Sequence, residues 1–323
     1  MAKKIGLVGI YFPGAYDALH ENVPEGFELV DALSPEAYGN LADCEYLISR
    51  LDIDPDIINH TPNVKFWQRW GAGFDHVDLK AWGERGIPIA TCPGVNSGIV
   101  AELAIMLMLA GYRNLLQINR QLRAGHWPRT EYFGRSFMIK GKTVGVLGLG
   151  HIGKKVAALA TAFGANVIYY DIVRQTEQEE QFGYRFVDFD TLLKESDIFT
   201  IHCPLNEETR GLIGAAQFAQ MKPTAMLINT ARGPIVDEAA LIDALTTGKI
   251  ATAGLDTYEH EPLPKDHPLL TLDNVVASAH AGGNTKDNDI NMVNYVYHNI
   301  VAFDRGEPLN TPGDIVNGEY LKK

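Results

Sequence analysis

The chain has 323 residues, a length that favours two domains of ordinary size over one. Apolar residues make up 46% and charged residues 21%, which is typical of globular proteins and excludes a disordered chain. Lysine and arginine number 28 against 40 acidic residues, and the net charge of −12 argues against nucleic acid or an anionic membrane as a partner.

The cysteine content, the N-terminus and the apolar runs of the sequence predict the compartment in which the protein is found. Three widely spaced cysteines, Cys44, Cys92 and Cys203, show no metal-ligand spacing and suit a reducing cytoplasm. The N-terminus passes from two lysines into a strand-like run without the small-residue cleavage site of a signal peptide. The most apolar stretch, residues 103–111, is far shorter than the roughly 20 residues of a membrane span. We expect a cytoplasmic protein with no membrane anchor, and a buried helix over 103–111.

The first third of the chain alternates short β-rich runs with helical or turn segments. Such alternation predicts a parallel sheet covered by crossover helices. The expected strands are residues 5–11, 27–30, 46–49, 65–70 and 87–91, with helical or turn segments over 35–41 and 79–85. Pro93 and Gly94 then end the series, and Ser97 can cap the next helix.

A connector helix is expected over residues 98–122, and a second alternating series follows it. The runs 143–147, 166–170, 198–202, 225–229, 250–255 and 275–278 are rich in aliphatic and β-branched residues, as buried parallel strands are. Residues 284–304 predict one long helix, and the tail from Gly306 is loop-like and is expected to rejoin the first domain. The predicted fold class is therefore α/β, with two doubly wound parallel sheets.

A glycine pattern follows the strand at 143–147. Gly148, Gly150 and Gly153 form G-x-G-x-x-G directly before an expected helix over 154–163, the context in which such a loop binds a pyrophosphate. Asp171 ends the next strand, 18 residues after the last glycine, where an acid binds the adenosine ribose. A carboxylate there repels a 2′-phosphate and favours NAD over NADP, whereas the nearby Arg174 could partly offset that repulsion.

Three later strands end next to residues that suit acid and anion chemistry. Arg232 follows the strand at 225–229, where its guanidinium could hold a carboxylate, although a surface arginine on a turn is the plainer alternative. Glu261 follows the strand at 250–255, and His280 follows the strand at 275–278. Ligands bind outside the carboxyl ends of strands in open α/β sheets, so these three residues are candidates for one site.

With these motifs the sequence resembles the D-isomer-specific 2-hydroxyacid dehydrogenase family over nearly its whole length. The family pattern combines the glycine loop and its Asp with an Arg in N-x-(A/S)-R-G-x-x-V-D, a Glu five residues after a strand-end Asp, and a His before Gly-Gly. Here these positions are Asn229–Asp237 with Arg232, Asp256 with Glu261, and His280 before Gly282 and Gly283. Residues 69–78 resemble the family's substrate loop, with Trp70 as a departure from the expected small residue.

The resemblance implies a Rossmann NAD-binding domain over residues 98–285, inserted in a flavodoxin-like substrate domain made of 1–97 and 286–323. It implies hydride transfer between NAD and a small 2-keto or 2-hydroxy acid, with His280 as proton donor, Glu261 as its partner and Arg232 as the carboxylate ligand. Backbone N–H groups near Ala72 and Gly73 would complete the anion site. The implied cofactor contacts are Gly148, Gly150, His151, Ile152, Gly153, Asp171, Cys203, Pro204, Thr230, Ala231, Asp256, Gly282 and Gly283.

Several alternatives remain open at this stage. A corepressor-like binding protein of the same fold would keep the NAD site and recruit peptides, and formate dehydrogenase is disfavoured because that branch has a glutamine where Glu261 stands. Glu259, His260, Asp266 and His267 could suggest a metal, but loop prolines separate the histidines and we expect none. The loop at 71–73 favours the glyoxylate, hydroxypyruvate and phosphoglycerate branches over the D-lactate branch. The family resemblance also implies a homodimer, with residues 123–137 crossing between subunits.

Overall fold

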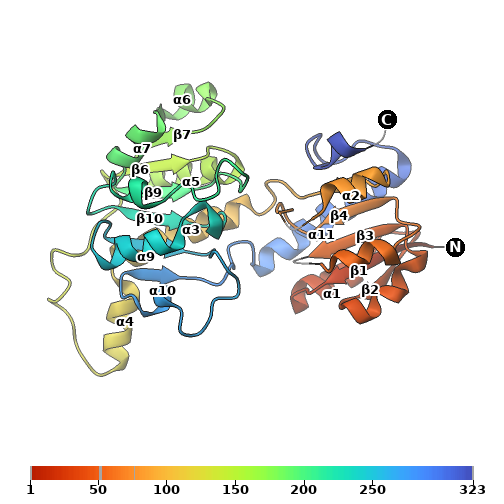
Figure 1. Cartoon of the computed structure of the whole chain (residues 1–323), viewed down its shortest axis with the longest axis horizontal. Coiled ribbons are helices and arrows are strands. Elements are labelled where there is room, and N and C mark those ends of the chain that lie inside the picture. Colours follow the sequence, from red (N-terminus) through yellow and green to blue (C-terminus); the bar gives the residue numbers. More distant parts are fainter. Residues whose placement is uncertain (1, 51–52, 76, 322–323) are drawn as a thin grey trace. The chain divides into compact units, whose positions relative to one another are not determined.

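The computed structural model describes residues 2–50, 53–75 and 77–321, and it divides into two compact units (Figure 1). Unit 1 comprises Met1–Asn96 and Asn284–Lys323, and unit 2 comprises Ser97–Gly283. These limits lie within two residues of the domain boundaries expected from the sequence. Each unit contains one sheet in which every pair of neighbouring strands is parallel, so the predicted α/β class with two parallel sheets is confirmed.

Unit 1 is built on a sheet of five strands in the order β2-β1-β3-β4-β5, the flavodoxin-like order. The strands are β1 Lys3–Gly9, β2 Phe27–Ala32, β3 Tyr46–Arg50, β4 Phe66–Arg69 and β5 Ile89–Ala90. The helices are α1 Pro13–Glu21, η1 Pro35–Asp43, η2 Pro55–His60, α2 Leu79–Glu84, α11 Lys286–Arg305 and η4 Gly318–Tyr320.

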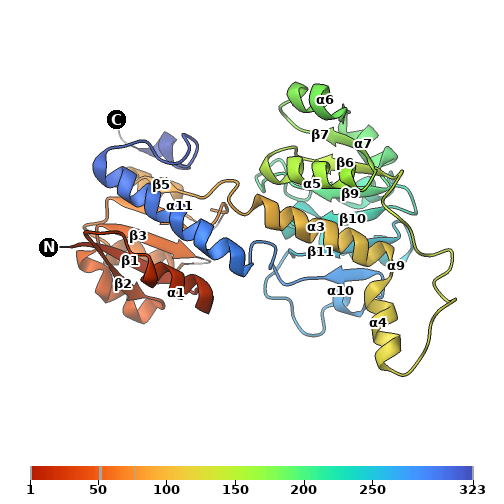
Figure 2. The same ribbon diagram turned by 180° about the vertical axis from the view of Figure 1, so that it is seen from behind.

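The two faces of this sheet bury different helices because successive side chains of a strand point to opposite faces. Ile5 and Leu7 of β1 pack with residues of α1 and α11, whereas Val8 packs with residues of η1 and α2. Helix α11 lies along the sheet beside α1 (Figure 2). The C-terminal segment therefore supplies one face of the core that the N-terminal strands begin.

Unit 2 is built on a sheet of seven strands in the order β12-β11-β10-β9-β6-β7-β8. The strands are β6 Thr143–Leu147, β7 Asn166–Tyr170, β8 Arg185–Phe186, β9 Ile198–Ile201, β10 Met226–Asn229, β11 Thr252–Leu255 and β12 Val275–Ala277. The helices are α3 Ser97–Tyr112, α4 Leu115–Arg123, α5 His151–Ala162, α6 Thr176–Phe182, α7 Phe189–Glu195, α8 Ala215–Phe218, η3 Gly233–Ile235, α9 Glu238–Thr246 and α10 Pro268–Thr271. The order reverses between β6 and β9, and such a switch point is where a Rossmann sheet binds its ligand.

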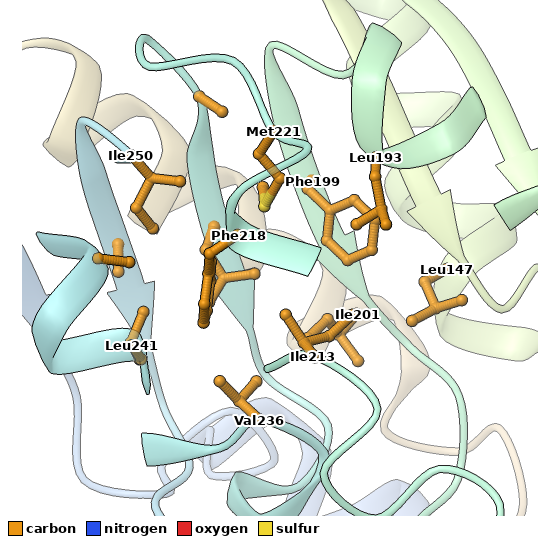
Figure 3. Close-up of a cluster of buried hydrophobic side chains, with 14 of the residues drawn as sticks. Leu147, Leu193, Phe199, Ile201, Ile213, Phe218, Met221, Val236, Leu241 and Ile250 are labelled. Atoms are coloured by element: carbon orange, nitrogen blue, oxygen red, sulfur yellow. The ribbon is translucent and has the colours of Figure 1, made fainter. Parts of the chain in front are cut away.

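The sheet of unit 2 is buried on both faces. Helices α3 and α5 cover one face (Figure 2), where Val144, Val146 and Ile228 are buried. Residues of α7, α8 and α9 cover the other face, with Phe199 and Ile201 at its centre (Figure 3). This double burial is the reason that the strands appear in the sequence as continuous apolar runs.

The expected connector helix over 98–122 is wrong as a single helix. The structure has α3 and α4, bent by 62° at a short break. Asn114 lies in the left-handed region at φ 51°, and its side-chain amide donates to the backbone oxygen of Arg135 at 3.1 Å. Asparagine tolerates this conformation better than other non-glycine residues, so a local backbone preference and a contact distant in sequence end the helix here.

Smaller differences concern short or terminal elements. Strand β8 was not predicted, and β5 is shorter than the expected 87–91. Helix α5 begins at His151, three residues before its expected start, and the tail contains η4 and an isolated bridge between Ala90 and Ile315. No single helix in the described part of the chain is long and apolar enough to span a membrane, and α3 with α4 passes that test only as a bent pair. The apolar residues 103–111 lie in α3, most of them buried, as expected.

Candidate active site

The glycine loop between β6 and α5 is held in a shape that side chains would disrupt. Gly148 has φ +91°, and a Cβ atom there would lie 2.7 Å from the backbone nitrogen of Cys203. A Cβ atom on Gly153 would lie 2.1 Å from the backbone oxygen of Gly148. Gly150 is the N-cap of α5, and a Cβ atom there would enter open space. The loop thus leaves room in front of the helix N-terminus, where backbone N–H groups bind phosphate. His151 and Ile152 form the first turn of that helix.

Asp171 follows β7 and is oriented by two backbone groups. Its Oδ2 atom accepts the N–H of Leu149 at 2.6 Å, and its Oδ1 atom accepts the N–H of Val173 at 3.0 Å. The first of these bonds ties the carboxylate to the glycine loop. The glycine loop and the acid expected to bind the ribose are therefore in direct contact.

Strands β9 and β10, on one side of the switch point, are each followed by a buried polar atom with no hydrogen-bond partner among the described residues. The Thr230 hydroxyl after β10 is one, and the Nδ1 atom of His202 after β9 is another. Burial lowers the pKa of His202 to about 3 and raises the pKa of Cys203 to about 11, so both are neutral near pH 7. Cys203 precedes Pro204, and a neutral, partly buried thiol is consistent with a packing role. Unmet polar groups at this edge fit a bound cofactor that supplies their partners.

Arg232 lies at the start of the loop that follows β10. Asn229, the last residue of the strand, donates from its side chain to the backbone oxygen of Arg232 at 2.9 Å and accepts the N–H of Ala231 at 3.1 Å. The guanidinium of Arg232 donates to the backbone oxygen of Ala231 at 2.8 Å. The strand-end asparagine therefore shapes the turn that presents the arginine.

Glu261 and His280 form an ion pair, with 2.6 Å between Oε2 of the glutamate and Nδ1 of the histidine. Burial raises the pKa of Glu261, but hydrogen bonds from His280 and from the N–H of Tyr258, together with the charge of Arg232, hold it below its ordinary value. His280 has φ 48°, an uncommon backbone state outside glycine, and its side chain is about half exposed. The three residues expected to do the chemistry thus lie within one electrostatic cluster.

Asp256 supports the loop that carries His280. Its backbone oxygen accepts the N–H of His280 at 2.8 Å, and its two carboxylate oxygens accept the N–H groups of Ala281 and Gly282, each at 2.9 Å. A Cβ atom on Gly282 would lie 2.9 Å from the Asp256 carboxylate, which explains the glycine before Gly283. The family resemblance implies that Asp256 is a cofactor ligand, whereas this supporting role, which links the segments after β11 and β12, was not predictable from spacing.

The expected substrate loop lies in unit 1, directly after β4. Arg69 donates to the backbone oxygen of Gly73 at 3.4 Å, and Gly71 before Ala72 has φ +123°. Trp70 packs edge-to-face on Tyr11 with ring centroids 5.8 Å apart, so it fills space beside the sheet edge. His76, within the expected loop, lies outside the described residues.

Of the acidic and histidine residues between 259 and 267, His267 has a role in local structure. His267 lies 3.0 Å from Glu238, the first residue of α9, and caps α10. No group of three or more His, Cys, Asp or Glu residues suited to a metal was found within residues 2–50, 53–75 and 77–321.

The fold, together with the groups at the carboxyl ends of the strands of unit 2, defines a two-unit α/β protein with a sheet of the dinucleotide-binding type. The family model for the NAD-binding domain of D-isomer specific 2-hydroxyacid dehydrogenases matches residues 105–282, more than half of the chain. The chain belongs to the D-isomer specific 2-hydroxyacid dehydrogenase family. The expected cofactor class, NAD, is confirmed by this match.

Relatives and solved structures agree with this assignment. The chain is 43% identical over 261 residues to a D-3-phosphoglycerate dehydrogenase of Archaeoglobus fulgidus, covering 81% of the chain but 49% of that relative. It is 38% identical to a glyoxylate reductase of Korarchaeum cryptofilum, covering 87% of the chain and 85% of the relative. The crystal structure of D-lactate dehydrogenase with NAD+ from Lactobacillus jensenii has a TM-score of 0.80 at 30% identity, covering 97% of the chain and 99% of that structure. The comparisons give no support to the corepressor alternative.

Proposed function

We propose that this protein reduces a small 2-keto acid to the D-2-hydroxy acid with NADH, and that it also catalyses the reverse reaction. The observation that carries the proposal is the Glu261–His280 ion pair beside Arg232, at the edge of a sheet whose glycine loop fits a pyrophosphate. NADH, when bound, supplies the hydride that adds to C2 of the keto acid.

His280 is the proposed proton donor. Glu261 contacts Nδ1, so the other ring nitrogen, Nε2, is the atom from which a proton would pass to the developing alkoxide. The Glu261 carboxylate fixes the orientation of the ring through its contact with Nδ1.

Arg232 is the proposed ligand of the substrate carboxylate. Its planar guanidinium can form two parallel hydrogen bonds to a carboxylate, and its charge also stabilises the oxyanion. From the family resemblance we further propose that the backbone N–H groups of Ala72 and Gly73 take part in substrate binding, which makes unit 1 the substrate domain.

The residues around the glycine loop are proposed to hold the cofactor. The helix N-terminus at Gly150, with His151 and Ile152, would bind the pyrophosphate, and Asp171 would accept the ribose hydroxyls. Cys203 and Pro204 would line the adenosine side, and the Thr230 hydroxyl, Ala231 and Asp256 would lie at the nicotinamide with Gly282 and Gly283. The orphaned Thr230 hydroxyl supports this placement.

The decisive experiment is NADH oxidation with a panel of keto acids. Glyoxylate and hydroxypyruvate are the expected substrates, because relatives such as that of Korarchaeum cryptofilum are glyoxylate reductases. Phosphohydroxypyruvate, pyruvate and branched or aromatic 2-keto acids complete the panel. Turnover of none of these acids, despite tight NADH binding, would contradict the proposed reaction while leaving the cofactor site intact.

We also propose that the enzyme is a cytoplasmic homodimer. Trp127 is 80% exposed and Phe133 is 73% exposed in the segment expected to cross between subunits, and large exposed aromatic residues often anchor a partner. Light scattering at micromolar concentration tests the dimer, and a monomeric mass would contradict it. The three free cysteines fit a reducing compartment, which cell fractionation tests.

A further inference from the structure

An arginine near the ribose-binding acid is held by a carboxylate. Arg174 lies on the segment after β7, three residues beyond Asp171. Its Nε atom donates to Oε1 of Glu179 at 2.8 Å, and its Nη2 atom donates to Oε2 at 2.7 Å. This is a bidentate pair, the geometry in which arginine and carboxylate bind each other best.

The carboxylate of Glu179 is itself fixed in place. The hydroxyl of Tyr169, on β7, donates to Oε1 of Glu179 at 2.7 Å and accepts the backbone N–H of Gln175 at 2.8 Å. Hydrogen bonds from Arg174 and Tyr169 lower the pKa of Glu179 to about 2, so it is charged at every physiological pH. The guanidinium carbon of Arg174 also lies 5.4 Å from the centre of the Phe186 ring.

The position of Arg174 matters because NADP differs from NAD by a phosphate on the ribose 2′-oxygen. Near that oxygen, an acid such as Asp171 repels the phosphate, whereas an arginine attracts it. Asp171 and Arg174, three residues apart, therefore have opposite expected effects on the binding of a 2′-phosphate. Which effect prevails depends on whether the guanidinium is available to the phosphate.

We propose that Glu179 sets the cofactor preference of this enzyme by holding Arg174 away from the 2′-phosphate of NADPH. Glu179 is a positioning residue here, since it acts through Arg174 and does not contact the cofactor. The proposal rests on the cofactor site proposed above. It would let a chain with an arginine beside its ribose-binding acid prefer NADH to NADPH.

The test measures binding rather than turnover. Glu179→Gln keeps the size of the side chain and an oxygen for Tyr169 but removes the charge that pairs with Arg174. We expect the Kd for NADPH, from cofactor fluorescence, to fall about tenfold while the Kd for NADH changes less than about threefold. The gain should shrink in high salt, because the side chain of Arg174 is exposed to solvent.

Two further variants separate this role from general charge effects and from a purely structural clamp. Glu180→Gln removes the same charge from the next residue of α6, which is exposed and whose side chain forms no hydrogen bond or ion pair with the described residues. It should leave the ratio of the two Kd values within about twofold of the wild type. The double variant Arg174→Gln with Glu179→Gln should lose the gain in NADPH binding.

The outcomes distinguish this proposal from the one on which it rests. Tight NADH binding with an unchanged Kd ratio in Glu179→Gln would overturn the role of Glu179 alone. Equal gains in Glu179→Gln and Glu180→Gln, or a gain that survives removal of Arg174, would also overturn it. Failure of the wild type to bind NADH would overturn the cofactor site itself. If Glu179→Gln does not fold, Glu179→Asp shortens the same carboxylate, and an unchanged Kd ratio there would count against the proposal.

Discussion

Unit 2 contains two histidine–glutamate pairs, His280 with Glu261 and His267 with Glu238. The first pair has its ring nitrogen 2.6 Å from the carboxylate, and its side chains are 49% and 34% exposed. The second pair is 3.0 Å apart, and its side chains are only 15% and 14% exposed. The same two residue types therefore form an accessible pair at a strand end and an enclosed pair between two helices.

The comparison shows that position decides what such a pair can do. The Nε2 atom of His267 contacts Glu238, and its Nδ1 atom accepts the N–H of Leu269, at the start of α10, at 3.4 Å. His280 lies on a loop after β12, held in a left-handed backbone state by its hydrogen bond to Asp256. The accessible pair suits proton transfer, and the enclosed pair suits holding loops together.

The largest expected difference between the pairs is in turnover. His280→Ala should lower kcat by about 10² to 10⁴, because a positioned proton donor contributes that much. His267→Ala should leave kcat within about threefold and instead lower the free energy of unfolding by about 1 kcal/mol, through lost hydrogen bonds. Steady-state kinetics and urea unfolding measure both.

An NADH titration is the control for the His280 variant. The glycine loop does not depend on His280, so the Kd for NADH should stay close to that of the wild type. Equal losses of turnover in the two histidine variants would abolish the distinction between the pairs.

The next largest effect is expected at Asp256, which supports the accessible pair. Asp256→Asn replaces one of the two carboxylate oxygens by an NH2 group, which cannot accept the N–H of Ala281 or Gly282 that it would face. The loop that carries His280 must therefore shift. We expect kcat to fall about 10- to 100-fold, in a protein destabilised by about 1–3 kcal/mol. Rate and thermal unfolding should change together, and a stable variant with full activity would rule out this support.

These roles show what the sequence could predict and what it could not. Gly148, Gly150 and Gly153 act within one turn, so their pattern predicted the loop geometry directly. Arg232, Glu261 and His280 were predicted because parallel strands bring their ends to one edge. The bend at Asn114, the support by Asp256 and the hold of Glu179 on Arg174 depend on partners distant in sequence or on side-chain rotamers, which spacing does not specify.

A change in pH dependence should separate the pairs further. Glu261→Gln replaces the carboxylate by an amide that cannot be protonated, so the part of the acidic limb of kcat/KM that reports protonation of Glu261 should disappear in the variant. The pKa of Glu261 lies below its ordinary value, so the wild-type carboxylate stays charged through neutral and mildly acidic pH. Coincident pH profiles for the wild type and the variant would remove Glu261 from this role.

The smallest expected effect on catalysis is at the partner of the enclosed histidine. Glu238 accepts a hydrogen bond from His267 and, at 3.3 Å, from the N–H of Glu259, so it joins the start of α9 to the loop before α10. Glu238→Gln keeps an oxygen for one of these contacts and loses the charge. We therefore expect a pH profile that superimposes on that of the wild type, and a loss of about 0.5–1.5 kcal/mol in the free energy of unfolding. Loss of the same part of the acidic limb as in Glu261→Gln would mean that the enclosed pair also acts on the reacting histidine.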